Sequence, residues 1–145
     1  MAYVDGFVIP IQTKNLAAYR KMAKKAGEIW MEYGALDYKE CVGDDMHPEG
    51  MTATFQNTLK LKRGETAVFS WIVYASKAER GRILKSVMAD PRLAGMSPKT
   101  MPFDLKRMLF AGFDVIVDMA PKKSAARSKR VIPKKKAAKR KTRRA

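Results

Sequence analysis

The chain has 145 residues and a formal net charge of +16, with 30 Lys or Arg against 14 Asp or Glu. Its single cysteine excludes an intrachain disulfide framework and favours a reducing compartment. The first residues lack a secretory signal pattern, and no apolar run approaches the roughly 20 residues of a membrane helix. We therefore expect a cytoplasmic protein with no membrane partner.

The positive charge is concentrated at the C-terminal end. From Pro121 onward there are thirteen Lys or Arg and no acidic residue, whereas the preceding residues hold seventeen against fourteen, a balance of only +3. Self-repelling charge without apolar periodicity is typical of disorder. We predict one folded domain over residues 1–120 and a disordered basic tail over residues 121–145.

The first third of the domain alternates between strand and helix patterns. Residues 3–9 follow the two-residue period of a strand. A stripe of apolar residues at steps of three and four then predicts a helix from the N-cap Thr13 to about Tyr33, closed by Gly34. Residues 36–43 alternate again and predict a second strand.

The rest of the domain adds two strands and one helix. Residues 44–63 are polar and irregular, with a short extra strand expected around residues 58–62. The segment TAVFSWIVYA, residues 66–75, is rich in β-branched and aromatic side chains and is the strongest strand pattern. A capping box, SKAE, begins at Ser76 and opens a second helix that ends before a proline. Residues 109–118 predict the last strand.

The predicted order is strand, helix, strand, strand, helix, strand. This order is the split βαβ arrangement of a ferredoxin-like α+β fold. In this fold two helices cover one face of a four-stranded antiparallel sheet. We therefore predict a ferredoxin-like βαββαβ domain.

The strongest strand is apolar on both of its faces, with Ile72 pointing to one side and Phe69 and Trp71 to the other. Two helices cover only one face, and a solvated face of an antiparallel sheet normally carries polar residues. A second subunit is the simplest cover for the remaining face, so we predict a homodimer. Alternatively, the loops at residues 44–63 or 93–102 fold over that face.

Five segments occur in order along the domain: YVDGFVIP, YGALDYKECVGDD, VFSWIVY, MADPR and MPFDLKRMLFAGF. Together they resemble the DUF1428 family of uncharacterised bacterial proteins. The resemblance implies a dimeric α+β barrel, in which the sheets of two ferredoxin-like domains pack face to face and a pocket lies between helices and sheet. It implies no activity, and it does not extend to the basic tail.

A small molecule in such a pocket would meet polar groups on the strands or just before the last strand. The candidates are Asp5, Glu40, Ser70, Trp71, Asp104 and Arg107. A carboxylate that faces an apolar cavity can act as a general acid or base, and an aromatic ring can stack on a flat ligand. Alternatively, Asp5 and Glu40 form ion pairs with Arg107 or Arg92 or lie in water at the edges of the sheet, and the aromatic side chains belong to the core.

Other catalytic patterns are absent from the sequence. The segment ECVGDDMHPEG holds the only His and the only Cys, too few for a typical zinc site, so we predict a solvated loop and no metal. The chain has no GxSxG nucleophile elbow and no GxGxxG or GxxxxGK[ST] phosphate loop. We predict no cofactor, and no residue is assigned a catalytic role.

The tail carries the charge pattern of a nucleic-acid-binding arm and resembles the Lys-, Ala- and Pro-rich arms of linker-histone-like proteins. Its cations are Lys122, Lys123, Arg127, Lys129, Arg130, Lys134, Lys135, Lys136, Lys139, Arg140, Lys141, Arg143 and Arg144. Each phosphate that such a cation neutralises releases condensed counterions, without reading the base sequence. Alternatively, the tail is a solubility or targeting extension.

Two function classes follow from these patterns. One is a dimeric barrel that binds a small molecule, with or without catalysis, and that its tail tethers to nucleic acid or another polyanion. The other is a non-catalytic, nucleoid-associated binding protein whose dimer presents two basic arms. An enclosed pocket lined by Asp5, Glu40 or Trp71 would favour the first class, and a filled core the second.

Overall fold

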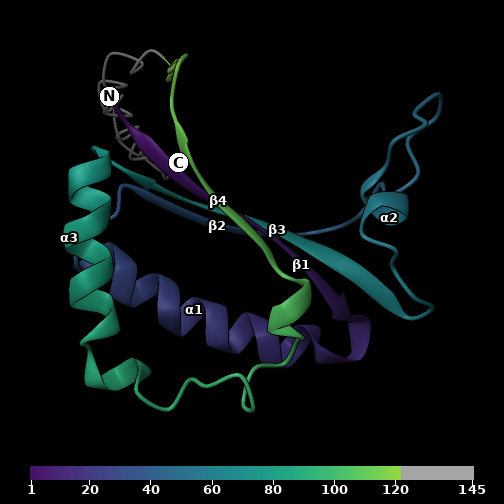
Figure 1. Ribbon diagram of the computed structural model, residues 1–145, viewed down its shortest axis with the longest axis horizontal. Helices are drawn as coiled ribbons and strands as arrows, with labels where there is room; N and C mark the ends of the chain where they lie inside the picture. The colour runs from purple at the N-terminus through teal and green to yellow at the C-terminus, as the bar shows by residue number, and fades with distance from the viewer. Residues whose placement is uncertain (122–145) are drawn as a thin grey trace, which may run out of the picture.

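The computed structural model describes residues 1–121, so the predicted tail from Lys122 onward lies outside the described residues. The elements follow in this order: β1 (Tyr3–Gln12), α1 (Leu16–Glu32), β2 (Asp37–Val42), the short α2 (Phe55–Thr58), β3 (Glu65–Tyr74), α3 (Lys77–Met88) and β4 (Leu109–Asp114). Figure 1 shows the sheet running diagonally, with α1 and α3 on one side of it.

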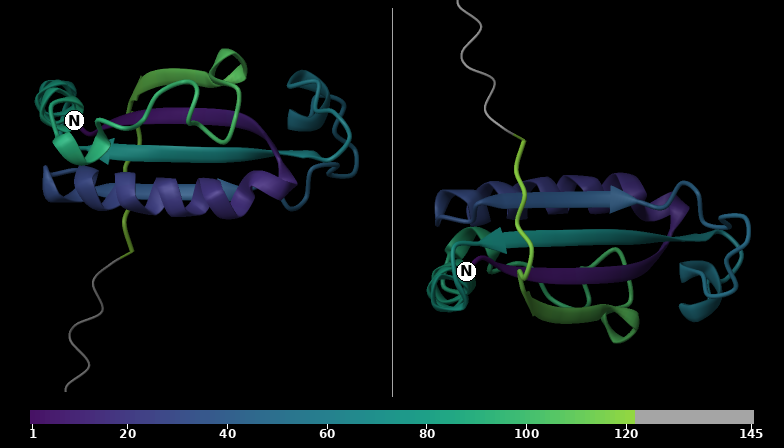
Figure 2. Two further views of the ribbon diagram at one scale, coloured as in Figure 1. Left: turned by 90° about the horizontal axis from the view of Figure 1, so that it is seen from below. Right: turned by 90° about the horizontal axis from the view of Figure 1, so that it is seen from above.

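The four strands form one antiparallel sheet in the order β2-β3-β1-β4. Both long helices lie on the same face of the sheet. In Figure 2 the left view shows the molecule from below, on the side of this face, and the right view shows it from above, on the opposite side. The predicted ferredoxin-like α+β fold is therefore confirmed. The register places Glu40 opposite Ser70, and Ser70 opposite Phe7, so these three side chains share one row on the helix-covered face.

Several predicted boundaries need correction. The strand β1 continues through Pro10 to Gln12. Its pairing with β4 stops at Val8, so from Pro10 onward that side of β1 is an open edge, where a strand tolerates proline. The extra strand expected at residues 58–62 is wrong, since α2 occupies the start of that segment. Thr54 caps α2 by accepting a hydrogen bond from the backbone N–H of Asn57.

The last strand is shorter than its sequence pattern. It ends at Asp114 rather than at residue 118, because Asp114 already pairs with Tyr3, the first residue of β1. Only Val115 extends the ladder, by donating its backbone N–H to the carbonyl of Ala2 at 3.1 Å. Ile116 and Val117 therefore have strand-forming side chains but no strand among residues 1–121 to pair with.

The helix ends follow local chemistry. Thr13 does not cap α1, because a 3-10 turn over Thr13–Asn15 precedes that helix. Gly34 has the predicted positive φ, at 113°, and ends α1. Ser76 caps α3 by accepting from the N–H of Glu79 at 3.1 Å, but the side chain of Glu79 bonds Arg82 instead of reaching back.

Two clusters of buried apolar side chains join the helices to the sheet. One gathers around Tyr74 and Ile83, and the other around Ile9 and Tyr19. At Gly27 the helix α1 comes so close to β2 that an added Cβ would lie 2.7 Å from the ring of Tyr38. Within residues 1–121 no helix is both long and apolar enough to cross a membrane.

The sheet face opposite α1 and α3, here called the outer face, is open, and it is largely apolar except along β2, where Asp37 and Lys39 form an exposed ion pair. Phe69, Leu109 and Phe113 lie on it and are 47%, 54% and 55% exposed. The loop that holds α2 reaches only one end of it, where the ring of Phe55 lies 6.2 Å from that of Phe69. The loop at residues 93–102 lies on the helix side instead (Figure 1).

Candidate functional site: a pocket between the helices and the sheet

A pocket of about 420 Å³ lies between the sheet, the helices α1 and α3, and the segment that connects α3 to β4. This volume lies within the range of small-molecule sites in proteins. Most of the lining is apolar. Among residues 1–121, the charged side chains that line it are Asp5, Glu40 and Arg80, which together carry a formal charge of −1.

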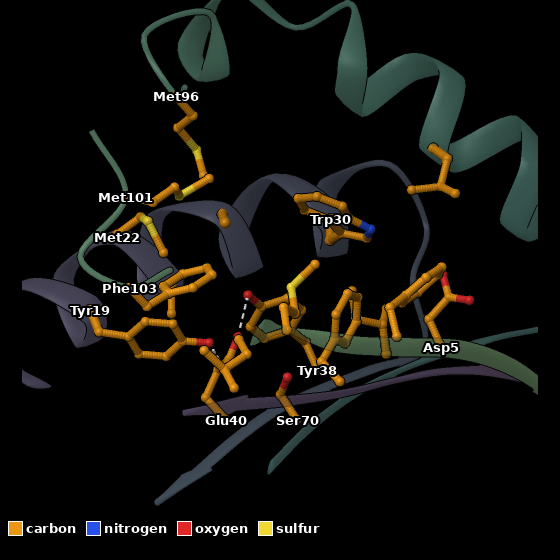
Figure 3. Close-up of a pocket in the computed structure, with 18 of the residues that line it drawn as sticks. Asp5, Tyr19, Met22, Trp30, Tyr38, Glu40, Ser70, Met96, Met101 and Phe103 are labelled. Carbon is orange, nitrogen blue, oxygen red and sulfur yellow. Dashed lines mark hydrogen bonds between the residues drawn. The ribbon is translucent and has the colours of Figure 1, made fainter. Parts of the chain in front are cut away.

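Glu40 accepts hydrogen bonds from two tyrosines. The hydroxyl of Tyr19 donates to its Oε2 at 2.7 Å, and the hydroxyl of Tyr38 donates to its Oε1 at 2.8 Å. Tyr19 comes from α1, whereas Tyr38 lies two residues before Glu40 on the same face of β2. Figure 3 shows both rings flanking the carboxylate at the floor of the pocket.

The two phenols are held in their protonated form. Burial raises the pKa of Tyr19 and of Tyr38 far above the usual value, and the carboxylate of Glu40 beside them raises it further. Each phenol therefore keeps its proton and donates a hydrogen bond to Glu40 across the neutral pH range. Each oxygen of Glu40 has two lone pairs and accepts one hydrogen bond from a phenol, so the carboxylate can accept further hydrogen bonds from a ligand.

An ion pair lies at the other end of the pocket. The side chain of Arg80, on α3, donates from Nε to both oxygens of Asp5, at 3.0 and 3.1 Å. Asp5 is 1% exposed, and the guanidinium of Arg80 lies 5.8 Å from the ring centre of Tyr3 and 5.7 Å from that of Phe110. This charge is thus neutralised by a dedicated partner, as buried charges require.

A second polar pair borders the same end of the pocket. The indole N–H of Trp30, on α1, donates to the hydroxyl of Tyr74 at 3.1 Å. Burial raises the pKa of Tyr74, and the nearby negative charge of Asp5 adds to the increase. The Tyr74 hydroxyl is therefore a neutral group that helps to position α1 on the sheet.

Methionines form much of the remaining wall. Met96 and Met101 come from the segment between α3 and β4, and Met22 faces them from α1, with Phe103 alongside (Figure 3). Thioether side chains are flexible and polarizable, and they adapt to irregular apolar shapes. The upper wall of the pocket can therefore adjust its shape around a ligand more readily than the floor.

The structure brings three of the six predicted pocket residues together. Asp5, Glu40 and Ser70 all line the pocket from the helix-covered face of the sheet. Trp71 does not, because it follows Ser70 along β3 and side chains alternate across a strand, so it points to the outer face. Its assignment to the pocket is corrected accordingly.

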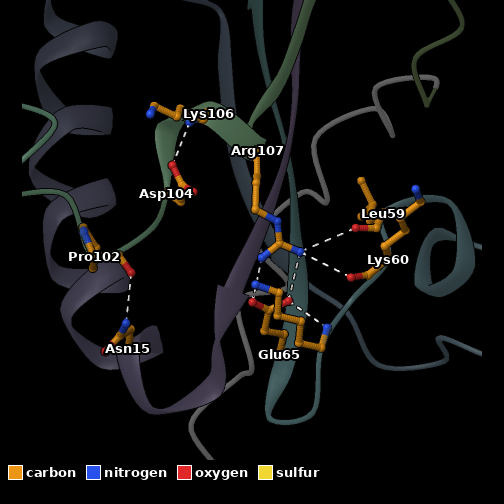
Figure 4. A network of polar contacts seen from close by, with 9 residues as sticks. Asn15, Leu59, Lys60, Glu65, Pro102, Asp104, Lys106 and Arg107 are labelled. Carbon is orange, nitrogen blue, oxygen red and sulfur yellow. Dashed lines mark hydrogen bonds and ion pairs between the residues drawn. The ribbon is translucent and has the colours of Figure 1, made fainter.

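Asp104 and Arg107 lie outside the pocket and hold the start of β4 in place (Figure 4). Asp104 accepts the backbone N–H of Lys106 at 3.0 Å and so caps a short 3-10 turn. Arg107 forms a bidentate pair with Glu65, at 2.6 and 3.0 Å. This pair joins the beginning of β4 to the beginning of β3, and it lowers the pKa of Glu65.

The alternative ion pairs expected for the pocket carboxylates are also not formed. Asp5 pairs with Arg80, and Glu40 bonds the two tyrosines, rather than Arg92 or Arg107. Arg92 instead bonds Asp90 and lowers the pKa of its carboxyl. Among residues 1–121, no three His, Cys or acidic side chains converge as a metal site would require.

Sequence reasoning missed Tyr19, Tyr38 and Arg80 as site residues. Tyr38 has a sequence signal, since it precedes Glu40 by two positions and so shares its face of a strand. Tyr19 is indistinguishable from the other members of the apolar stripe of its helix. Arg80 lies on a helix with several other cations, and only the packing of α3 against β1 selects it as the partner of Asp5.

Known proteins place the chain in a family. Over 118 residues it is 42% identical to the Escherichia coli K12 protein described as "Uncharacterized protein YbaA". The match covers 81% of this chain and 99% of the relative, and a Shigella flexneri protein of the same description matches equally. The crystal structure of an uncharacterized NIPSNAP domain protein from Burkholderia xenovorans is similar in fold, with a TM-score of 0.51, 16% identity and coverage of 82% of this chain and 98% of that one. The model of the family described as "Protein of unknown function (DUF1428)" matches residues 2–105. The chain belongs to the DUF1428 family.

Proposed function

We propose that this protein is a homodimer that binds a small, largely apolar molecule in the pocket between its helices and its sheet. The observation that carries the proposal is the Glu40 carboxylate, which belongs to an exposed residue of the edge strand β2, reaches the wall of a mostly apolar pocket and is held by two protonated tyrosines. A filled core would be expected to have no such cavity and no such oriented acceptor.

The charge of the lining indicates the class of ligand. Asp5 and Arg80 neutralise each other, so in the part of the chain that the structure describes Glu40 is the one charged side chain of the pocket wall without an ion-pair partner. An apolar molecule with a positive charge or a hydrogen-bond donor at one end would match this arrangement. A molecule with an anionic end would lose its hydration and meet a like charge.

Three small aromatic probes test this proposal. Benzylamine, toluene and benzoate have similar rings but carry a cation, no charge and an anion, respectively. By NMR titration of the full chain we expect benzylamine to bind most tightly and benzoate most weakly, with shifts at residues of the pocket. Glu40→Gln should weaken benzylamine about tenfold and leave toluene unchanged, whereas Glu49→Gln, on an exposed loop, should change neither.

Two results would contradict the pocket proposal. One is the absence of ligand-induced shifts at pocket residues with any of the probes. The other is equal affinity of the parent and the Glu40→Gln variant for benzylamine, because the carboxylate would then not face the ligand. Mass spectrometry of small molecules that co-purify with the chain offers a direct route to the natural ligand.

The homodimer is proposed from the outer face. Phe69, Leu109 and Phe113 are about half exposed there, and so contiguous an apolar surface is unusual on a monomer. Light scattering should give about twice the 16.3 kDa mass of one chain. Phe113→Asp should shift the protein to the monomer mass. The control Lys85→Asp, on the exposed side of α3, should not. A parent chain that is monomeric at tens of micromolar would exclude the dimer.

The basic tail extends the proposal to nucleic acid. Its thirteen cations without an acidic neighbour favour a sequence-independent electrostatic tether. The alternative function, a non-catalytic nucleoid-associated protein whose dimer presents two arms, shares this tether and differs in having no pocket ligand. The probe titration therefore distinguishes the two.

A further inference from the structure

The guanidinium of Arg80 has hydrogen-bond donors that its ion pair with Asp5 does not use. Its Nε–H bonds both oxygens of the Asp5 carboxylate, at 3.0 and 3.1 Å. Among residues 1–121, no acceptor bonds its two terminal amino groups, Nη1 and Nη2, which together carry four N–H donors. Arg80 also belongs to the lining of the pocket. These donors are therefore available to a molecule that enters the pocket.

The surroundings of the guanidinium favour a neutral acceptor over an anion. The guanidinium lies 5.8 Å from the ring centre of Tyr3 and 5.7 Å from that of Phe110, and Asp5 balances its charge. A carbonyl oxygen can bond the terminal amino groups while the ion pair stays intact. An anion at the same place would also approach the carboxylate of Asp5 and be repelled by it.

The other strong donor at this end of the pocket is already engaged. The indole N–H of Trp30 donates to the hydroxyl of Tyr74 at 3.1 Å, and an indole has no second N–H. Arg80 is thus the group of this end that is equipped to recognise an acceptor on a ligand.

The Arg80 end and the Glu40 end lie on opposite sides of the pocket, as Figure 3 shows for Asp5 and Glu40. Glu40 lies opposite Ser70 in the sheet, and Ser70 lies opposite Phe7. Asp5 precedes Phe7 by two residues, so ordinary strand spacings place the Cα atoms of Glu40 and Asp5 roughly 12 Å apart. The lining between the two ends is mostly apolar.

We propose that the pocket selects a molecule with two polar ends. Such a molecule has a hydrogen-bond donor or cation at the Glu40 end, an apolar middle, and a neutral acceptor such as a carbonyl at the Arg80 end. This inference rests on the proposed function of the pocket and adds a second polar subsite to it. Hydrogen bonds from a charged donor are stronger than those between neutral groups, so the second end should add to the affinity.

Three para-substituted benzylamines test the second subsite. Para-methylbenzylamine, para-(aminomethyl)benzamide and para-(aminomethyl)benzoate share the ring and the amine. They differ at the far end, which is apolar, a neutral acceptor and an anion, respectively. By NMR titration of the full chain we expect the amide to bind about fivefold more tightly than the methyl compound. The benzoate should bind no more tightly than the amide.

The substitution Arg80→Lys tests which donors bind the acceptor. Lysine keeps a cation for Asp5 but has one compact ammonium group in place of the planar fork, so the ion pair occupies it. We expect the preference for the amide over the methyl compound to fall below about twofold. Unchanged affinity for the methyl compound would show that the pocket is intact. As the matched control, Glu40→Gln should weaken both compounds about tenfold and leave the preference unchanged.

The orientation of the bound amide gives a second readout on the parent chain. Nuclear Overhauser contacts should place the aminomethyl end beside Tyr19, which bonds Glu40, and the carboxamide end beside Phe110, which lies next to Arg80. The reverse orientation would overturn the assignment of the two ends.

The outcomes separate this inference from the pocket proposal. If the methyl compound binds in the pocket and the amide binds no more tightly, the second subsite is overturned and the pocket proposal stands. Tighter binding of the benzoate than of the amide overturns the neutral acceptor, and an unchanged preference in Arg80→Lys overturns the role of Arg80. If no compound shifts the resonances of pocket residues, both proposals fail. The ranking in the parent chain decides even if Arg80→Lys does not fold.

Discussion

Replacing Arg80 with methionine is expected to lower the free energy of unfolding by about 3 kcal/mol. The substitution keeps the length and much of the packing of the side chain but leaves the Asp5 carboxylate, which is 1% exposed, without its cation. An uncompensated buried charge is among the costliest single changes in a protein. We expect the lower end of the usual range because the Arg80 side chain is itself 24% exposed.

Urea unfolding followed by far-UV circular dichroism measures this effect. Arg82→Met is the matched control, because Arg82 lies on the same helix and also pairs with a carboxylate, Glu79, but with both side chains exposed. We expect little change there, since surface ion pairs contribute little. Combining Arg80→Met with Asp5→Asn should recover part of the loss; a double variant less stable than Arg80→Met alone would contradict the account.

Deleting residues 121–145 is expected to remove most of the affinity for duplex DNA at low salt. The remaining chain carries only +3, so few cations are left to release counterions from phosphates. For the full chain, if about eight of the thirteen cations engage, affinity should fall about 10⁴-fold between 50 and 200 mM salt. Unrelated DNA sequences should bind nearly equally, because contacts from Lys and Arg to phosphates carry no base-sequence information.

Gel shifts at two salt concentrations compare the full and truncated chains. A chain whose tail is scrambled in order but not in composition serves as the matched control, and it should bind like the parent. A dimer should bind more tightly than one arm, because the second arm then acts at high local concentration. If the truncated chain bound DNA as well as the whole, the folded domain and not the tail would be the nucleic-acid reader.

The sequence by itself determined the order of the elements. Strand and helix periodicity are local properties, so the strand at residues 66–75 and both long helices were predicted to within a few residues. The apolar character of both faces of β3, and the resemblance of five segments to the DUF1428 family, can likewise be recognised from short stretches of sequence. Boundaries that depend on a distant partner were not predictable, and β4 ends early because β1 begins at Tyr3.

The composition of the pocket was decided by the tertiary structure. Side-chain alternation could place Asp5, Glu40 and Ser70 on common faces of their strands, but which face the helices would cover depends on packing. That packing carried Trp71 to the outer face instead. Besides Tyr38, which lies beside Glu40 on β2, the partners of the two carboxylates are Tyr19 of α1 and Arg80 of α3, at separations of 21 and 75 residues along the chain. No local pattern records such pairings, because they arise only when the helices settle on the sheet and bring distant side chains within hydrogen-bonding distance.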